Sequence, residues 1–159
     1  MSRKLNLRFD KCNELDIIDK YFRHQNLIDF QERGFLLMEQ EEQNFPTEIR
    51  ENCLVLFLDG EITNLCEKSV FAAYDEAIQA DVATIILDFE KVRYINSAGI
   101  AVFINLLKKV RQKQQNLFIA NLSDYFRKIF TMIGLTRYSK CYQTLDQAIA
   151  DSKGLKISE

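Results

Sequence analysis

The chain has 159 residues, of which 47% are hydrophobic and 28% charged, which suits one domain with its own core plus an appendage. The formal net charge is −2, from 21 basic and 23 acidic side chains mixed along the sequence, which argues against the clustered basic face of a nucleic-acid-binding domain. Apolar runs are far too short for a signal peptide or a membrane span, so we expect a cytoplasmic protein without a membrane partner.

Residues 1–45 form an extension with a pattern of its own. Leu15, Ile18 and Phe22 have helical spacing and predict an amphipathic helix. We expect its apolar stripe to pack on the following domain or on a second copy of the chain, which would make a dimer through the extension. Residues 35–38 fit an edge strand, and the acidic, glutamine-rich residues 39–44 fit a solvated loop.

Strands and helices alternate through the remaining residues, 46–159. Continuous apolar runs predict buried strands near 53–58, 83–88 and 117–121, with a short strand near 138–142. Apolar residues at helical spacing predict helices near 65–80, 98–114, 124–133 and 145–151. This order is typical of an α/β domain with a mainly parallel or mixed sheet of four to five strands. We expect its core to include Leu56, Leu58, Ile86, Leu87, Ile104, Leu107, Ile119, Ile129 and Phe130.

The residue types that carry catalysis or bind metals are sparse. The scattered cysteines form no CxxC pair, so we expect neither a zinc site nor a redox site, and idle or buried thiols suit a reducing compartment. The single histidine, His24, has polar neighbours and fits a surface helix better than a catalytic base. Ser97 lacks the first glycine of a Gly-x-Ser-x-Gly elbow. We therefore expect no enzymatic activity, cofactor or metal.

A serine lies where a predicted buried strand leads into a helix. Residues 88–99 read Asp-Phe-Glu-Lys-Val-Arg-Tyr-Ile-Asn-Ser-Ala-Gly. The N–H groups in the first turn of a helix have no intrahelical acceptor, so Ser97 is placed to cap this helix. A phosphate on Ser97 would meet N–H donors and the positive end of the helix dipole. The local chemistry favours a phosphorylatable serine.

These residues resemble the signature of STAS (sulfate transporter and anti-sigma factor antagonist) domains from anti-sigma factor antagonists. In that signature a strand leads through Asp-Ser-Ser/Thr-Gly-Leu/Ile into a helix. Residues 59–62, Asp-Gly-Glu-Ile, resemble the family's Gly-Glu-Leu-Asp segment, and residues 122–135 resemble its third helix and glycine turn. The resemblance covers roughly the last two-thirds of the chain, and it implies a sheet with helices chiefly on one side. In the family, an anti-sigma factor kinase phosphorylates the serine, and phosphorylation releases the partner.

The resemblance implies a non-catalytic bacterial module of signal transduction and transcription regulation, whose partner is an anti-sigma factor or a related serine kinase. Ser97 aligns with the phosphoacceptor. The implied partner-binding residues are Glu61, Thr63, Asn96, Ala98, Gly99 and Ile100. Two positions depart from the family: Asn96 and Thr63 each stand where the family has an aspartate. Both departures remove a carboxylate that would repel a phosphate or help to orient the hydroxyl.

Two other functions stay open at this point. The same two departures fit a structural STAS scaffold that docks in a signalling complex without a phosphate cycle. A receiver-like phosphoaspartate domain shares the alternating pattern and would use Asp88, which we expect to end a buried strand. A receiver also needs a lysine after a late strand, and residues 120–122 read Ala-Asn-Leu.

Overall fold

The structure, a computed structural model, describes residues 43–155. These residues form one five-stranded sheet with the strand order β1-β2-β3-β4-β5. The antiparallel edge strand β1 pairs with β2, and β2 to β5 are all parallel. The mixed sheet predicted from the sequence is therefore confirmed. The strands are β1 (Thr47–Arg50), β2 (Cys53–Ile62), β3 (Thr84–Ile95), β4 (Asn116–Ala120) and β5 (Lys140–Tyr142).

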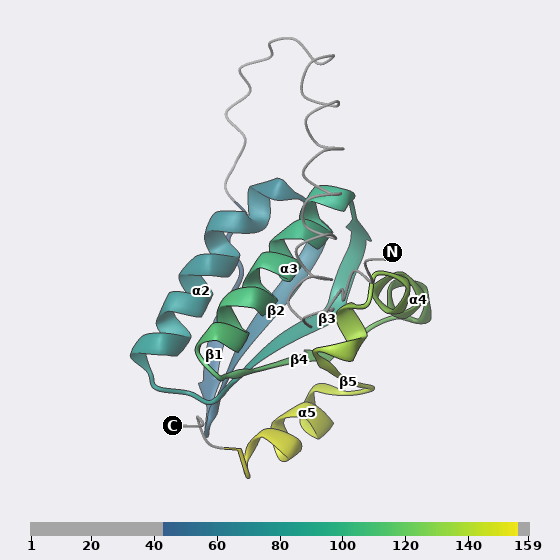
Figure 1. Cartoon of the computed structure of the whole chain (residues 1–159). Coiled ribbons are helices and arrows are strands. Elements are labelled where there is room, and N and C mark those ends of the chain that lie inside the picture. Colours follow the sequence, from purple (N-terminus) through teal and green to yellow (C-terminus); the bar gives the residue numbers. More distant parts are fainter. Residues whose placement is uncertain (1–42, 156–159) are drawn as a thin grey trace, which may run out of the picture.

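The helices lie chiefly on one face of the sheet, as Figure 1 shows. Side chains of α2, α3 and α4 share one core with that face, whereas α5 packs on the opposite face. Two short 3-10 helices, η1 and η2, follow β2 and α4. The bounds are α2 (Glu67–Gln79), α3 (Ser97–Gln112), α4 (Asp124–Met132), α5 (Leu145–Ser152), η1 (Asn64–Cys66) and η2 (Leu135–Arg137).

Two cores lie on the two faces of the sheet. The larger core has an aromatic centre, in which the ring centroid of Phe89 lies 5.4 Å from that of Phe103 and 5.6 Å from that of Phe130. The smaller core lies under α5 and contains Ile86. All the predicted core residues are buried except Ile129, which is half-buried against the larger core.

The strands β2 and β3 are longer than the sequence predicted. Strand β2 continues to Ile62, with Asp59 and Glu61 exposed, and β3 continues past Asp88 to Ile95. The prediction that the strand ends at Asp88 was therefore wrong. The two strands stay paired along this extension through register shifts on either side of Asp59 and Gly60, and Gly60 has a φ of +74° that suits a bulge.

The N-terminal part of the domain contains one element that the sequence did not predict. Strand β1 pairs Thr47 with Leu56 and Arg50 with Cys53. Phe45, the last residue of the predicted extension, is buried in the larger core. The predicted edge strand at 35–38 and the helical stripe of residues 15–22 lie outside the described residues, so both stay predictions.

Candidate functional site

The parallel pairing of β2 and β3 brings the two segments singled out in the sequence to one edge of the sheet. Ile62 pairs with Ile95, and the backbone N–H of Asn96 donates to the carbonyl oxygen of Ile62 at 3.2 Å. The chain then enters η1 after β2 and α3 after β3, at the upper end of the sheet in Figure 1. We call this surface the serine edge and define it as Glu61, Thr63, Asn96, Ser97 and Ala98.

Helix α3 begins at Ser97, and its cap is Asn96. Asn96 has extended backbone angles, and its Oδ1 accepts the backbone N–H of Gly99 at 2.8 Å. The prediction that Ser97 caps the helix was therefore wrong. Asparagine caps helices as well as aspartate or serine does. Asn96 thus caps the helix without the charge that an aspartate would bring, and Ser97 is the first helical residue.

Thr63 makes a comparable contact at the neighbouring turn. Its Oγ1 accepts the backbone N–H of Leu65 at 3.2 Å and caps η1. Both departures from the family signature are therefore neutral side chains that still bond a backbone N–H. As a result, Glu61 is the only charged residue among the five of the serine edge.

Gly99 and Ile100 lie beneath this edge. Both residues are buried, and Ile100 belongs to the larger core. A Cβ at Gly99 would lie only 2.3 Å from the carbonyl oxygen of Ile62, so the first turn of α3 can approach β2 this closely only with a glycine. Asn96, Ser97 and Ala98 are half-buried, and Glu61 is exposed. The expected partner contacts of these residues stay predictions.

Tyr94 is an exposed aromatic residue beside this edge that the sequence analysis did not select. Its side chain is 52% exposed, and it pairs with Glu61 across β2 and β3. Tyrosine is enriched at protein interfaces. Tyr94 could have been found only by continuing β3 beyond Asp88.

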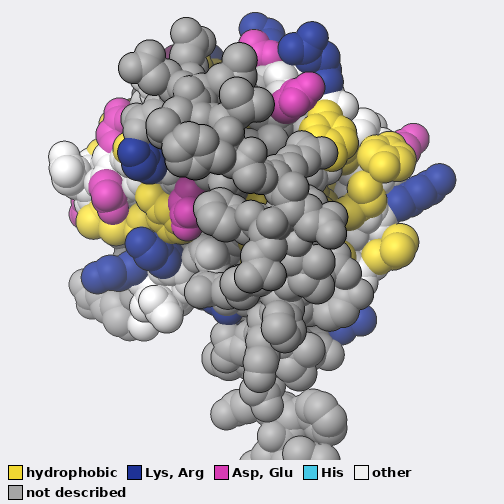
Figure 2. Space-filling model, turned by 90° about the horizontal axis from the view of Figure 1, so that it is seen from above, with side chains coloured by type: hydrophobic (Ala, Val, Ile, Leu, Met, Phe, Trp, Pro, Cys, Tyr) yellow, Lys and Arg dark blue, Asp and Glu magenta, His cyan; other side chains and the backbone are white. Residues whose placement is uncertain are grey.

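A second group of exposed apolar residues lies on the side of α4. Figure 2, seen from above, shows hydrophobic side chains gathered there, and Tyr125 and Met132 of α4 are exposed.

Asp88 has a structural role inside the sheet. It is 4% exposed, and its Oδ1 accepts from the backbone N–H of Glu90 at 3.1 Å and from Nδ2 of Asn121 at 2.8 Å. A receiver needs an accessible aspartate, and its flavodoxin-like sheet has the order 2-1-3-4-5. The buried Asp88 and the observed strand order do not fit the receiver alternative.

The remaining chemistry of the described residues is modest. Burial raises the pKa of the Cys53 and Cys66 thiols, so both stay protonated at neutral pH. Within residues 43–155, no three His, Cys, Asp or Glu side chains are grouped so that they could hold a metal ion. No helix in this range has the length and apolar character needed to cross a membrane.

Comparisons with known proteins agree with this architecture. The STAS domain family model matches residues 44–148. The anti-sigma-B factor antagonist of Listeria monocytogenes is 29% identical over 96 residues, which cover 58% of this chain and 84% of the relative. The anti-sigma factor antagonist SpoIIAA in its unphosphorylated form shares the fold with a TM-score of 0.55 and 23% identity, over 70% of this chain and 99% of SpoIIAA.

A second SpoIIAA structure, the Bacillus protein in its phosphorylated form, has a TM-score of 0.55 and 25% identity, over 67% of this chain and 97% of that chain. The matched region contains all five strands and the whole serine edge. The chain therefore belongs to the STAS domain family, as the signature around Ser97 predicted.

Proposed function

We propose that this protein is a non-catalytic regulatory module of the bacterial cytoplasm that binds a protein partner through the serine edge, as an anti-sigma factor antagonist. Support comes from the family and from relatives that bear this name. The observation that carries the proposal is the position of Ser97. It is the first residue of α3, and Asn96 rather than Ser97 caps the helix.

Ser97 is in this proposal the phosphoacceptor of a partner switch. The first N–H groups of α3 lack intrahelical acceptors, and the positive end of the helix dipole favours an added phosphate. The neutral caps Asn96 and Thr63 remove two carboxylates that would repel it. The likeness to SpoIIAA, whose structure is known in a phosphorylated form, supports this assignment.

Phosphorylation would disrupt binding without unfolding the domain. The partner, an anti-sigma factor or a related serine kinase, would contact Glu61, Thr63, Asn96 and Ala98, together with the underlying Gly99 and Ile100. A phosphate on Ser97 adds about −2 charge at pH 7. Across a packed interface that charge must be desolvated against groups that do not pair with it, which costs binding free energy.

The test compares Ser97→Ala and Ser97→Asp in the full-length protein, expressed in its native cells. Wild-type protein should carry phosphate on Ser97 by mass spectrometry, and Ser97→Ala should carry none there. Ser97→Ala should retain the partner. Ser97→Asp should weaken partner affinity by at least ~1.4 kcal/mol, or tenfold, with nearly unchanged melting because an acidic residue suits the first turn of a helix.

Thr144→Asp is the matched control. Thr144 caps α5 on the opposite face of the sheet, its Oγ1 accepts the backbone N–H of Gln147 at 3.3 Å, and aspartate caps well. This variant adds the same charge at another helix start and should leave binding unchanged. Equal partner affinity of Ser97→Asp and Thr144→Asp would reject the switch and favour a structural STAS scaffold.

A further inference from the structure

A recessed surface lies at the opposite end of α3 from Ser97. We call it the β5 groove; it has a volume of ≈ 1250 Å³, and α3, α4, η2, β5 and α5 all contribute to its lining. Its floor includes the half-buried side chains of Cys141 and Tyr142, and the residues Leu107 and Leu117, which also line it, are buried. Its polar rim contains Arg111, Arg127, Arg137, Tyr138, Lys140 and Asp151.

The rim of the β5 groove is strongly positive although the whole chain has a net charge of −2. The lining contains four basic side chains and one carboxylate, that of Asp151. That carboxylate already pairs with Nζ of Lys140 at 2.9 Å and accepts a hydrogen bond from the Tyr142 hydroxyl. Arg111 and Arg127 form no ion pair with any residue between 43 and 155. The groove therefore carries positive charge that its own acid does not neutralise.

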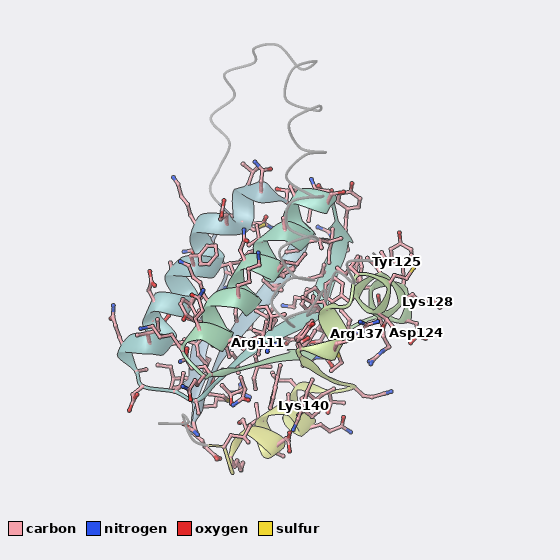
Figure 3. All side chains as sticks on the ribbon, in the orientation of Figure 1. Arg111, Asp124, Tyr125, Lys128, Arg137 and Lys140 are labelled. Atoms are coloured by element: carbon pink, nitrogen blue, oxygen red, sulfur yellow. The ribbon has the colours of Figure 1, made fainter. Side chains whose placement is uncertain are left out.

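We propose that the β5 groove binds an acidic, extended segment of a partner protein. The two basic side chains that form no ion pair among residues 43–155 come from separate elements, Arg111 from α3 and Arg127 from α4. Figure 3 shows Arg111 together with Arg137 of η2 and Lys140 of β5. Charges distributed in this way suit successive carboxylates of a chain better than a single small anion. The groove also exceeds the roughly 300–1,000 Å³ that is usual for small-ligand pockets.

Two local features suit a peptide. The Arg111 guanidinium lies over the Tyr138 ring, 4.6 Å from its centroid, which restrains a group that can bind a carboxylate with two hydrogen bonds. Strand β5 pairs only with residues 118–120 of β4, so Asn116 and Leu117 extend beyond it along the groove. An extended segment can lie there with an apolar side chain on the floor and its acidic side chains on the rim.

The β5 groove is separate from the serine edge. Ser97 and Arg111 are fourteen residues apart on α3, which corresponds to about 21 Å along the helix axis. The two surfaces can therefore be occupied at the same time. This second partner site goes beyond the proposed function and does not depend on phosphorylation of Ser97.

The test selects a random-peptide phage library on the full-length protein and measures the synthesised best binder by fluorescence anisotropy. The selected peptides should be rich in Asp and Glu around at least one large apolar residue. Arg111→Glu should weaken binding at least about fivefold, because it replaces an attraction with a like-charge contact. Arg127→Gln should also weaken peptide binding, because it removes a positive charge from the groove. Raising the NaCl concentration from about 0.1 M to about 1 M should also weaken it, since the Debye length falls from about 10 Å to about 3 Å.

Lys113→Glu is the matched control, because Lys113 is exposed at the end of the same helix but does not line the groove. Lys113→Glu and Ser97→Asp should both bind the peptide as wild type does. The proposal is overturned if no acidic peptide is selected, or if Arg111→Glu binds as well as Lys113→Glu. It is also overturned if inorganic phosphate displaces the peptide, which would indicate a small-anion site. A wild-type dimer that Arg111→Glu dissociates in sedimentation would assign the groove to a second copy instead.

Discussion

The contact between Gly99 and β2 offers a direct test of how the serine edge is built. A Cβ at Gly99 would lie 2.3 Å from the carbonyl oxygen of Ile62 and 2.7 Å from its carbonyl carbon. Ordinary van der Waals contact begins at 3.4 Å, so the oxygen would be about 1.1 Å too close. The same oxygen accepts the backbone N–H of Asn96. Gly99→Ala must therefore either separate α3 from β2 or strain both backbones.

The magnitude follows from three contributions. Overpacking costs about 1–3 kcal/mol, and weakening the Asn96 hydrogen bond costs about 1 kcal/mol. Alanine returns at most about 1 kcal/mol through its higher helix propensity. We expect a net loss of about 1–3 kcal/mol in the free energy of unfolding. At roughly 4 °C per kcal/mol for a domain of this size, the melting temperature should fall by about 4–12 °C.

The assay is thermal and urea denaturation of the full-length protein, with Gly154→Ala as the control. A Cβ at Gly154 would meet nothing within 4 Å, so that variant should stay within about 0.5 kcal/mol of wild type. If Gly99→Ala were as stable as Gly154→Ala, the close approach of α3 to β2 would not be what requires a glycine at this position.

Three further measurements test the cap, the two cores and one carboxylate. Asn96→Ala should lower the free energy of unfolding by about 0.5–2 kcal/mol while Asn96→Asp stays near wild type; equal losses in urea denaturation would contradict the capping role. Leu107→Ala in the larger core and Ile86→Ala in the smaller one should each cost about 2–5 kcal/mol by the same assay, and losses well below this range would contradict the two cores. The hydrogen bond from Tyr142 is the main cause that lowers the pKa of the Asp151 carboxyl. The ionised carboxylate of Asp151 therefore stabilises the folded state above about pH 4, and this stabilisation is lost as the pH falls through the lowered folded-state pKa. The stability difference between wild type and Asp151→Asn should close in acid, and a difference that persists there would refute this linkage.

Most of the fold could be predicted because its strands and helices have strong local patterns. Continuous apolar runs located the first parts of β2 and β3, and helical spacing located α3. Strand β1, Thr-Glu-Ile-Arg, has only one apolar residue, so no apolar pattern marks it as a strand. It forms a strand through its antiparallel pairing with β2. The end of β3 was misplaced because Asp88 usually signals a turn. Here its carboxylate binds Asn121, 33 residues further along the chain, and no local pattern predicts such a contact.

The position of the helix cap could not be decided from the sequence for a different reason. Asn96 and Ser97 are both good capping residues, so propensity does not separate them, and the helix start is uncertain by one residue. The structure decides in favour of Asn96 through its extended backbone and the hydrogen bond that its Oδ1 accepts from the backbone N–H of Gly99. Ser97 is therefore left at the first helical position.

This geometry bears on how a phosphate would act at the serine edge. With aspartates in place of Asn96 and Thr63, the edge would carry two more negative charges before any phosphorylation. Among the five residues of the serine edge only Glu61 is charged, so a phosphate of about −2 would change its charge from −1 to about −3, a larger relative increase than from −3 to about −5 in an edge with both aspartates. Asn96→Asp keeps the cap and restores one carboxylate, so it separates the two effects of this position. If the switch operates through charge, this variant should weaken partner binding in the unphosphorylated state while leaving the melting temperature unchanged. Undiminished binding would mean that the partner reads the shape of the edge rather than its charge.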